Sequence, residues 1–454
     1  MATSPEPTRA SPPDTSVAAT LKLAWPLLLA NLAMVGNATI DAVMAGRLSA
    51  EDMAGVAVAA SIYVTVYVSF MGVLQALSPI AGHHYGAQRW RAIGDDLQQA
   101  LWLAGLLFLI ALPCVLATGF WSRVAGLEGR VADITADYLY AVAFGLPAGL
   151  ATRVFVALNA AVSRPKVTML VNLTVLGLKA PLNAVFMYGW GPWDAMGGAG
   201  AGVATAVLAW LGFAMSLAIW RFDPFYDRLR SGALHGPRWA SQRELLKLGV
   251  PIGVTMLFEV TSFTFMAVLI ARLGAVPVAG HQIVANLVAL LFMVPLSLGI
   301  ASSVLVAQSL GYGSRELART AVRHGFVMAL VVALVAAAVL WLFRDAIVGL
   351  YTRDAAVAQT AVALLGLAAI FHLFDATQGM ATFVLRGYRK TLWPMIIYGV
   401  ALWALGLGGG AWIAFNHTPL GPPRGVDGFW QAATVALGLA AVLLAWLARR
   451  EVRK

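Results

Sequence analysis

The sequence predicts an all-α polytopic membrane protein with about 12 transmembrane helices in two pseudo-symmetric six-helix bundles. Of its 454 residues, 60% are hydrophobic and only 11% are charged, and the mean hydropathy is +0.79. A soluble domain would carry roughly 25% charged residues. Apolar segments of about 20–25 residues, each long enough to cross a bilayer, recur along the chain. The second half repeats features of the first at a fixed spacing, which indicates two related bundles.

The predicted helices are separated by short polar connections, which leave no room for a soluble catalytic domain. Length and hydrophobic pattern place them at residues 18–46, 52–78, 92–117, 132–156, 165–190, 199–221, 245–272, 277–308, 318–343, 355–385, 392–415 and 426–448. Residues 1–16 are rich in proline and contain no apolar segment, so they are predicted to be a disordered tail. Residues 449–454 are predicted to be a basic C-terminal tail.

The net charge of +10 is a topology signal and does not indicate binding to nucleic acid. If the N-terminus is cytoplasmic, most of the 31 lysines and arginines fall on the inner side, among them Arg386, Arg389 and Lys390 after the tenth helix. Membrane proteins keep an excess of these residues in cytoplasmic loops. We therefore expect both termini to be cytoplasmic.

The two halves match at an offset of about 225 residues. Lys22-Leu23-x-x-Pro26 corresponds to Lys247-Leu248-x-x-Pro251, and Arg47-Leu48 corresponds to Arg272-Leu273. Since each half holds an even number of helices, the repeats are parallel and related by an axis along the membrane normal. We predict a first lobe over residues 17–221, a cytoplasmic linker over 222–244 and a second lobe over 245–448. This layout is typical of a rocker-switch transporter.

Three acidic residues lie inside apolar helices: Asp41 in the first, Glu259 in the seventh and Asp375 in the tenth. A charge at that depth costs several kcal/mol on insertion scales, so these side chains are expected to face a polar cavity. Burial favours the neutral form of a carboxyl group, which suits reversible proton binding. For Asp41 an alternative is a helix-end acid paired with Arg47.

Other polar residues share helical faces with these acids or begin a neighbouring helix, and they are candidates for lining a cavity. They are Asn37, Thr255, Ser262, Gln282, Asn286 and Gln378. Lys179 lies one turn before Asn183 in the fifth helix. It either extends to the outer interface or pairs with Asp41 in the first lobe, where it would repel a sodium ion.

Several motifs of other protein classes do not occur. Without G-x-x-x-x-G-K-[ST], ATP-driven transport is not expected. Neither H-E-x-x-H nor G-x-S-x-G is present, so we do not expect an enzyme. Cys114 is the only cysteine, which excludes an intramolecular disulfide.

The longer motifs point to a known family. They are Ile40-Asp41-Ala42-Val43-Met44-Ala45-Gly46-Arg47-Leu48-Ser49, Arg164-Pro165, Pro181-Leu182-Asn183, Tyr188-Gly189, Gly198-Ala199-Gly200-Ala201-Gly202-Val203-Ala204-Thr205-Ala206, Leu257-Phe258-Glu259-Val260, Ala279-Gly280-His281-Gln282-Ile283 and Leu385-Arg386-Gly387-Tyr388. Over nearly its whole length the chain resembles the MATE (multidrug and toxic compound extrusion) transporters, in particular their NorM-like branch.

The resemblance implies an antiporter that expels small cationic, amphipathic compounds in exchange for H⁺ or Na⁺, with no other cofactor. It implies that Glu259 and Asp375 form a cation site in the second lobe, which is also the candidate Na⁺ site, and that Asp41 handles protons or substrate. Two positions depart from the family pattern. Lys179 stands where an amide is common, which favours protons, and Phe371 stands where some relatives have a cavity tyrosine.

The resemblance further implies a monomer, surrounded by lipid in a bacterial inner membrane. The alternative within transport is a flippase or exporter of another substrate, such as a lipid-linked sugar, from the same superfamily. A flippase for a pyrophosphate-linked substrate needs a strongly basic cavity, whereas here acids predominate inside the membrane. We therefore expect cationic cargo.

Overall fold

The computed structural model describes residues 12–190, 194–230, 234–417, 419 and 421–454, and within them it is all-helical. Twelve helical segments are long and apolar enough to cross a membrane, which confirms the predicted fold class. They are α1 (Val17–Leu48), α2 with α3 (Ala50–Leu74, Leu77–Gly86), α4 (Trp90–Leu116), α6 (Gly129–Ala161), α7 (Pro165–Tyr188), α8 (Ala199–Phe222), α9 (Trp239–Ala271), α10 (Ala275–Tyr312), α11 (Arg315–Leu342), α13 (Ala355–Gly387), α14–η2–α15 (Leu392–Tyr398, Gly399–Gly408, Gly409–Phe415) and α16 (Gly425–Arg453).

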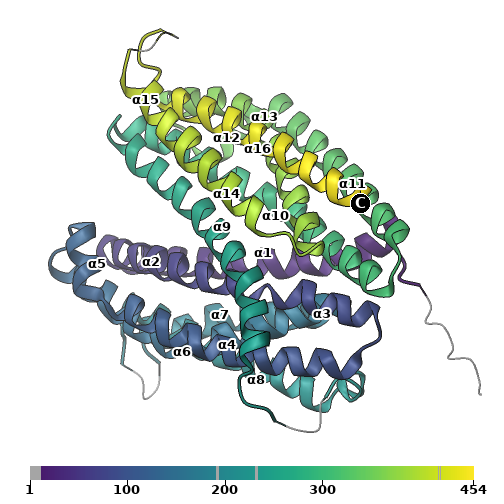
Figure 1. Ribbon diagram of the computed structural model, residues 1–454. Helices are drawn as coiled ribbons and strands as arrows, with labels where there is room; N and C mark the ends of the chain where they lie inside the picture. Colours follow the sequence, from purple (N-terminus) through teal and green to yellow (C-terminus); the bar gives the residue numbers. More distant parts are fainter. Residues whose placement is uncertain (1–11, 191–193, 231–233, 418, 420) are drawn as a thin grey trace, which may run out of the picture.

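Helices α1–α8 form one bundle and α9–α16 form the other (Figure 1). Each bundle has its own apolar core. The two cores exchange residues where the bundles meet: Leu245 and Leu248 of α9 pack into the first core, while Leu23 and Ala24 of α1 pack into the second. The first turns of the two equivalent helices therefore tie the halves together.

Two short helices were not predicted. They are α5 (Thr118–Ala125) and α12 (Arg344–Tyr351), and they occupy equivalent places after the third span of each half. A segment of eight residues is too short to cross a bilayer, so a search for spanning segments passes over both. Their equivalence extends the repeat beyond the spanning helices.

The predicted linker and tails differ in extent from those in the structure. Helix α9 begins at Trp239, inside the predicted linker, and α16 continues through Arg453, so most of the basic tail is the last turn of that helix. Residues 1–11 of the predicted tail and residues 231–233 of the predicted linker lie outside the described residues. The described part of the tail is bonded to the protein: Ser16 caps α1, and the Thr15 carbonyl oxygen lies 2.9 Å from His324 Nδ1.

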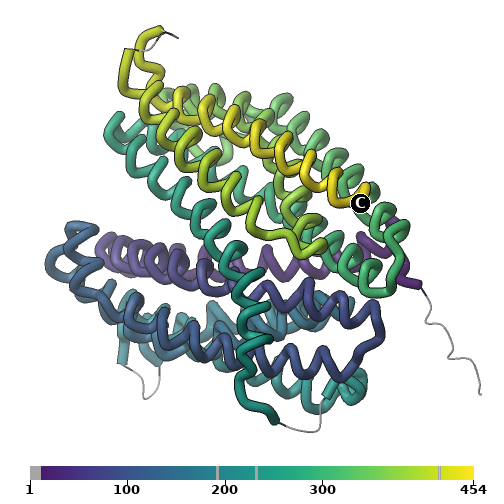
Figure 2. Tube along the Cα trace, in the orientation of Figure 1, coloured from purple at the N-terminus to yellow at the C-terminus, as the bar shows by residue number. Residues whose placement is uncertain are grey.

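The halves approach most closely at one end, which we call the closed end. There Gly86 lies against the backbone of Gln308, and Gly311 lies against the backbone of His83. Gln308 Nε2 also donates across the interface to Ala161 O at 2.7 Å and to Ser163 Oγ at 2.9 Å. Toward the other end, where α5 and α15 lie, the bundles diverge (Figure 2). We call this the open end.

Replacing Gly86 with alanine should weaken this closure. A Cβ at Gly86 would lie 1.9 Å from Gln308 O, a backbone atom that cannot move aside without the helix. Such overpacking costs about 1–3 kcal/mol, so the closed end should open about tenfold more often. The measurement is maleimide labelling of Leu305→Cys, a buried residue at this interface, in a Cys114→Ala background. Gly105→Ala is the control, because its Cβ meets nothing within 4 Å. Equal labelling of both variants would contradict the prediction.

Candidate ion and substrate sites

The first lobe holds a buried ion pair between α1 and α7. Lys179 Nζ lies 2.9 Å from Asp41 Oδ1, and Asn183 Nδ2 donates to the same oxygen at 2.7 Å. Lys179 also donates to Thr205 Oγ1 of α8 at 2.6 Å. The Lys179 side chain is only 2% exposed. Of the two predicted arrangements, it therefore adopts the pair with Asp41 and does not extend to the outer interface. Thr205, which the sequence did not single out, completes the group.

Arg47, the alternative partner predicted for Asp41, does not pair with it among the described residues. Asp41 is buried against Lys179 and Asn183, and Arg47 forms no ion pair with it in the part of the chain that the structure describes. Asn37, one turn earlier on α1, donates to Ala33 O at 3.0 Å, and its Oδ1 has no partner among the described residues. That free amide oxygen is an acceptor beside the pair.

The second lobe holds a chain of hydrogen bonds that ends on Asp375. Gln378 Nε2 donates to Asp375 Oδ1 at 3.0 Å, and the Tyr398 hydroxyl donates to Gln378 Oε1. All three residues are buried. Tyr398 ends α14 and precedes the π-helical segment η2; π-helical turns are rare and occur frequently at functional sites. Tyr398 was not predicted as a site residue, because an aromatic residue in an apolar helix carries no sequence signal of a polar site.

Glu259 is half-buried on α9, and its carboxylate forms no hydrogen bond or ion pair with the described residues. It lies within electrostatic range of Asp375 and of Arg386. The predicted neighbours bond to their own helix: Thr255 donates to Pro251 O at 2.7 Å and Ser262 donates to Glu259 O at 2.9 Å. The hydroxyl hydrogens of Thr255 and Ser262 are therefore already donated within α9, whereas the carboxyl group of Glu259 is available to a ligand.

The other predicted cavity residues form no hydrogen bond with Asp375, Gln378 or Tyr398 in the part of the chain that the structure describes. Gln282 is exposed, and Asn286 accepts a hydrogen bond from Tyr351 Oη of α12 at 3.2 Å. Phe371 is 2% exposed and packs edge-to-face on Phe263 and Trp430, as a core residue does. With Ser262 it lines a cavity of about 20 Å³, room for about one water molecule.

Arg386 corrects the predicted end of the tenth span, because α13 continues to Gly387. The sequence placed it in a cytoplasmic loop, but it lies within α13 and is 7% exposed. Its Nη1 donates to Gln75 Oε1 of the other half at 3.2 Å, and its guanidinium lies 4.5 Å from the centre of the Phe383 ring. It therefore joins the two lobes close to Glu259.

Among the described residues, no group of three or more His, Cys, Asp or Glu side chains is arranged to hold a metal ion. The two second-lobe acids are a pair. A monovalent cation or a proton is the ligand that two carboxyl groups and neutral oxygens fit best.

Comparison with known sequences gives a consistent result. The family model described as MatE matches residues 26–185 and 251–412. The "Probable multidrug resistance protein NorM" of Aromatoleum aromaticum is 40% identical over 434 residues, covering 95% of this chain and 93% of the relative. The "Multidrug resistance protein NorM" of Vibrio parahaemolyticus is 36% identical over 439 residues, covering 95% of both.

Solved structures have the same fold. The chain superposes on "Crystal structure of eukaryotic MATE transporter AtDTX14" with a TM-score of 0.85 and 21% identity, covering 96% of this chain and 98% of that one. It superposes on "Outward-facing conformation of a multidrug resistance MATE family transporter of the MOP superfamily" with a TM-score of 0.86 and 18% identity, covering 96% of each chain.

The Asp41–Lys179 pair should contribute to stability as a unit. Lys179→Met leaves a buried carboxylate without its counter-charge, which typically costs about 3–5 kcal/mol. The double variant Asp41→Asn, Lys179→Met removes both charges and should recover much of this loss. The measurement is the thermal midpoint in detergent. Arg47→Gln, the control, should leave the midpoint unchanged; a large fall with Arg47→Gln and none with Lys179→Met would contradict the pairing.

Proposed function

The chain belongs to the MatE family, and we propose that it exports cationic amphipathic compounds across a bacterial inner membrane in exchange for H⁺ or Na⁺. Its relatives named multidrug resistance protein support multidrug efflux as the overall function. The observation that carries the proposal is the Glu259 carboxylate, which has no bonded partner among the described residues and is close enough to Asp375 for their charges to interact. Arg386 is within electrostatic range of Glu259 but forms no ion pair with it among the described residues, so a bound cation would supply the direct counter-charge.

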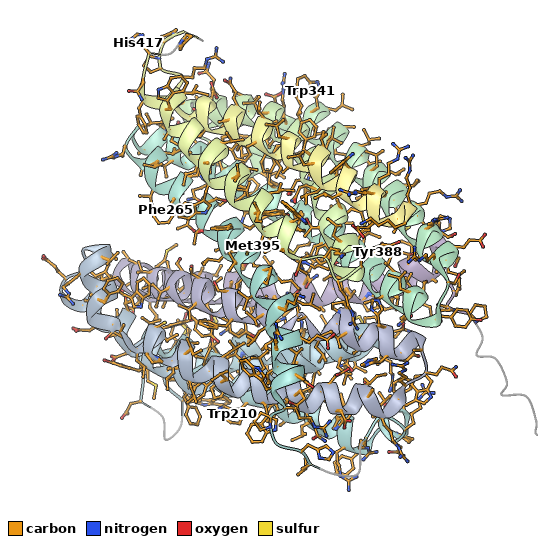
Figure 3. The ribbon with its side chains drawn as sticks, in the orientation of Figure 1. Trp210, Phe265, Trp341, Tyr388, Met395 and His417 are labelled. Atoms are coloured by element: carbon orange, nitrogen blue, oxygen red, sulfur yellow. The ribbon has the colours of Figure 1, made fainter. Side chains whose placement is uncertain are left out.

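Aromatic side chains near Glu259 fit the amphipathic part of the cargo. Phe258 and Phe265 of α9 both pack on Trp403 of η2, at 6.2 and 5.5 Å between ring centres. Phe265 is 46% exposed and lies on the edge of the second lobe that faces the diverging first lobe (Figure 3). Aromatic faces attract organic cations and bury their apolar parts.

Mutually exclusive occupancy of the two acids accounts for exchange. Two neighbouring carboxylates repel each other, so a bound cation relieves the repulsion whether it is a drug, a proton or a sodium ion. Cargo and coupling ion therefore compete for one site, which is the energetic linkage that antiport needs. In the first lobe Lys179 already satisfies Asp41, which supports protons acting at Glu259 and Asp375 as the coupling ion.

The closed end fits the cytoplasmic side. A cavity of about 870 Å³ there is lined by Lys22, Arg164, Lys166 and Arg228, the excess of basic residues expected on that side. Both termini would then be cytoplasmic, and the structure would be open to the outside. In the transport cycle the Gly86–Gln308 and Gly311–His83 contacts separate while the diverging ends close, and a monomer is sufficient for this motion.

Proteoliposomes loaded with a fluorescent organic cation test the proposal. We expect a proton gradient to drive efflux, and Glu259→Gln and Asp375→Asn each to lower the rate at least about tenfold, because each removes an ionisable carboxyl group from the pair. Asp345→Asn is the matched control, since Asp345 is an exposed acid on α12.

Each gradient is applied separately, to the wild type and to Lys179→Asn. Efflux driven by sodium alone would overturn proton coupling while leaving the antiporter standing. No efflux under either gradient would favour a flippase or an exporter of another substrate. Full activity in both acid variants would remove the carboxyl groups from the mechanism.

A further inference from the structure

Arg153 is a half-buried arginine in the middle of α6. This helix is the most buried of the twelve spans, because 61% of the residues in its apolar 18-residue stretch are buried inside the protein. The exposed part of an arginine on such a helix opens toward the interior of the protein, because a lipid-facing guanidinium would be far costlier. Arg153 therefore faces a space that water or a ligand can enter.

The guanidinium of Arg153 is held by neutral groups of α1 and α2. Its Nε donates to Tyr67 Oη at 2.9 Å, its Nη2 lies 3.1 Å from Met34 Sδ, and its Cζ lies 5.6 Å from the centre of the Tyr67 ring. It forms no ion pair with an acid among the described residues. Arginine always carries its charge and has five N–H donors, so a full positive charge and several donors are left for a ligand.

The repeat shows what occupies the same place in the second lobe. Pro26 and Pro251 are equivalent, and at the same spacing Met34 corresponds to Glu259. Helices α6 and α13 match end to end, Gly129 with Ala355 and Ala161 with Gly387, so Gly149 corresponds to Asp375.

Neither acid of the second lobe has a counterpart in the first, but Arg153 lies one helical turn after Gly149 on α6 and contacts Met34. Tyr67 Oη donates to Gly149 O at 3.2 Å, and the arginine that Tyr67 holds touches Met34. The first lobe thus carries a positive charge next to the positions that correspond to the two acids of the second lobe.

From this we propose that Arg153 is a specificity-determining anion site, which binds a carboxylate on amphipathic cargo whose cationic group reaches Glu259 and Asp375. The ligand of this site is then the carboxylate of a compound that also carries a cationic group. This inference rests on the proposed function and adds to it a second recognition point in the other lobe. Arginine binds carboxylates through two parallel hydrogen bonds, which gives both affinity and orientation.

The test compares two dyes that differ only at one carboxyl group: tetramethylrhodamine, a zwitterion at neutral pH, and its methyl ester, a cation. Both are loaded into proteoliposomes, and efflux of each is measured for the wild type, Arg153→Gln and Arg153→Lys. Losing a charged hydrogen-bonded partner should lower efflux of the free acid about tenfold in Arg153→Gln. Efflux of the ester should stay the same or rise, and Arg153→Lys should recover part of the free-acid transport.

Tyr67→Phe is the matched control for a structural role, because it removes the hydrogen bond that holds Arg153 and keeps the charge. We expect this variant to keep most of the preference between the two dyes. If Arg153 only supports the fold, Arg153→Gln and Tyr67→Phe will lower efflux of both dyes alike, and the proposal is overturned. If the wild type exports the ester and never the free acid, the anion site is also rejected while the antiporter stands.

Binding of the same dyes in detergent, followed by fluorescence anisotropy, gives a readout independent of transport. Arg153→Gln should raise the Kd of the free acid about tenfold and leave that of the ester unchanged. A wild type that exports neither dye and binds neither dye would reject the proposed function itself, a result distinct from failure of the Arg153 site.

Discussion

An ionised side chain inside a bilayer is stable only if its charge is matched, and the two lobes meet this requirement differently. In the first lobe the match is internal, because Asp41 has Lys179 at 2.9 Å and Asn183 at 2.7 Å. In the second lobe Glu259 has no such partner among the described residues. An ion pair whose two charges match each other contributes rigidity. An acid without an ion-pair partner in the protein would instead pair with a cation that it binds. In the proposed mechanism, an acid therefore supports structure in one lobe and ligand binding in the other.

The contact between the lobes determines how such a site is exposed. At the closed end the halves meet backbone to backbone, with Gly86 on Gln308 and Gly311 on His83. Packed helices of this kind do not deform gradually, so the interface is either formed or broken. The repeat places equivalent glycines on both sides, which lets two rigid bundles close against each other. In the proposed cycle, Glu259 of the second lobe would then face one side of the membrane at a time.

Most of the fold could be predicted because a bilayer restricts the chain strongly. Hydropathy and length located the twelve spans, and an acid in an apolar helix identified Asp41, Glu259 and Asp375. The short helices α5 and α12 were missed because eight residues leave no such signal. The burial of Arg386 was missed because a position near a helix end looks the same in sequence whether the side chain faces water or the other lobe.

Contacts between helices limited the prediction of the sites. Tyr398 reaches Gln378 from another helix, and Asn286 turns toward Tyr351 instead of the acids. Both outcomes depend on how helices are rotated against each other, which the spacing within one helix does not determine. Lys179 shows the same limit, since its sequence position allowed two directions and only the packing of α1 against α7 selects one.

The charges of the two lobes are complementary rather than duplicated, which bears on the origin of broad specificity. A duplicated bundle with the same acids on both sides would present only negative charge to cargo and would repel any anionic group. With Arg153 next to the corresponding positions in one lobe and Glu259 and Asp375 in the other, the two lobes would set up an electric field between them. A field of this kind orients a dipolar molecule before any close contact forms. Because each lobe is a rigid bundle, its rotation would carry one charge relative to the other, so the two ends of an oriented cargo would be pulled apart during the exchange.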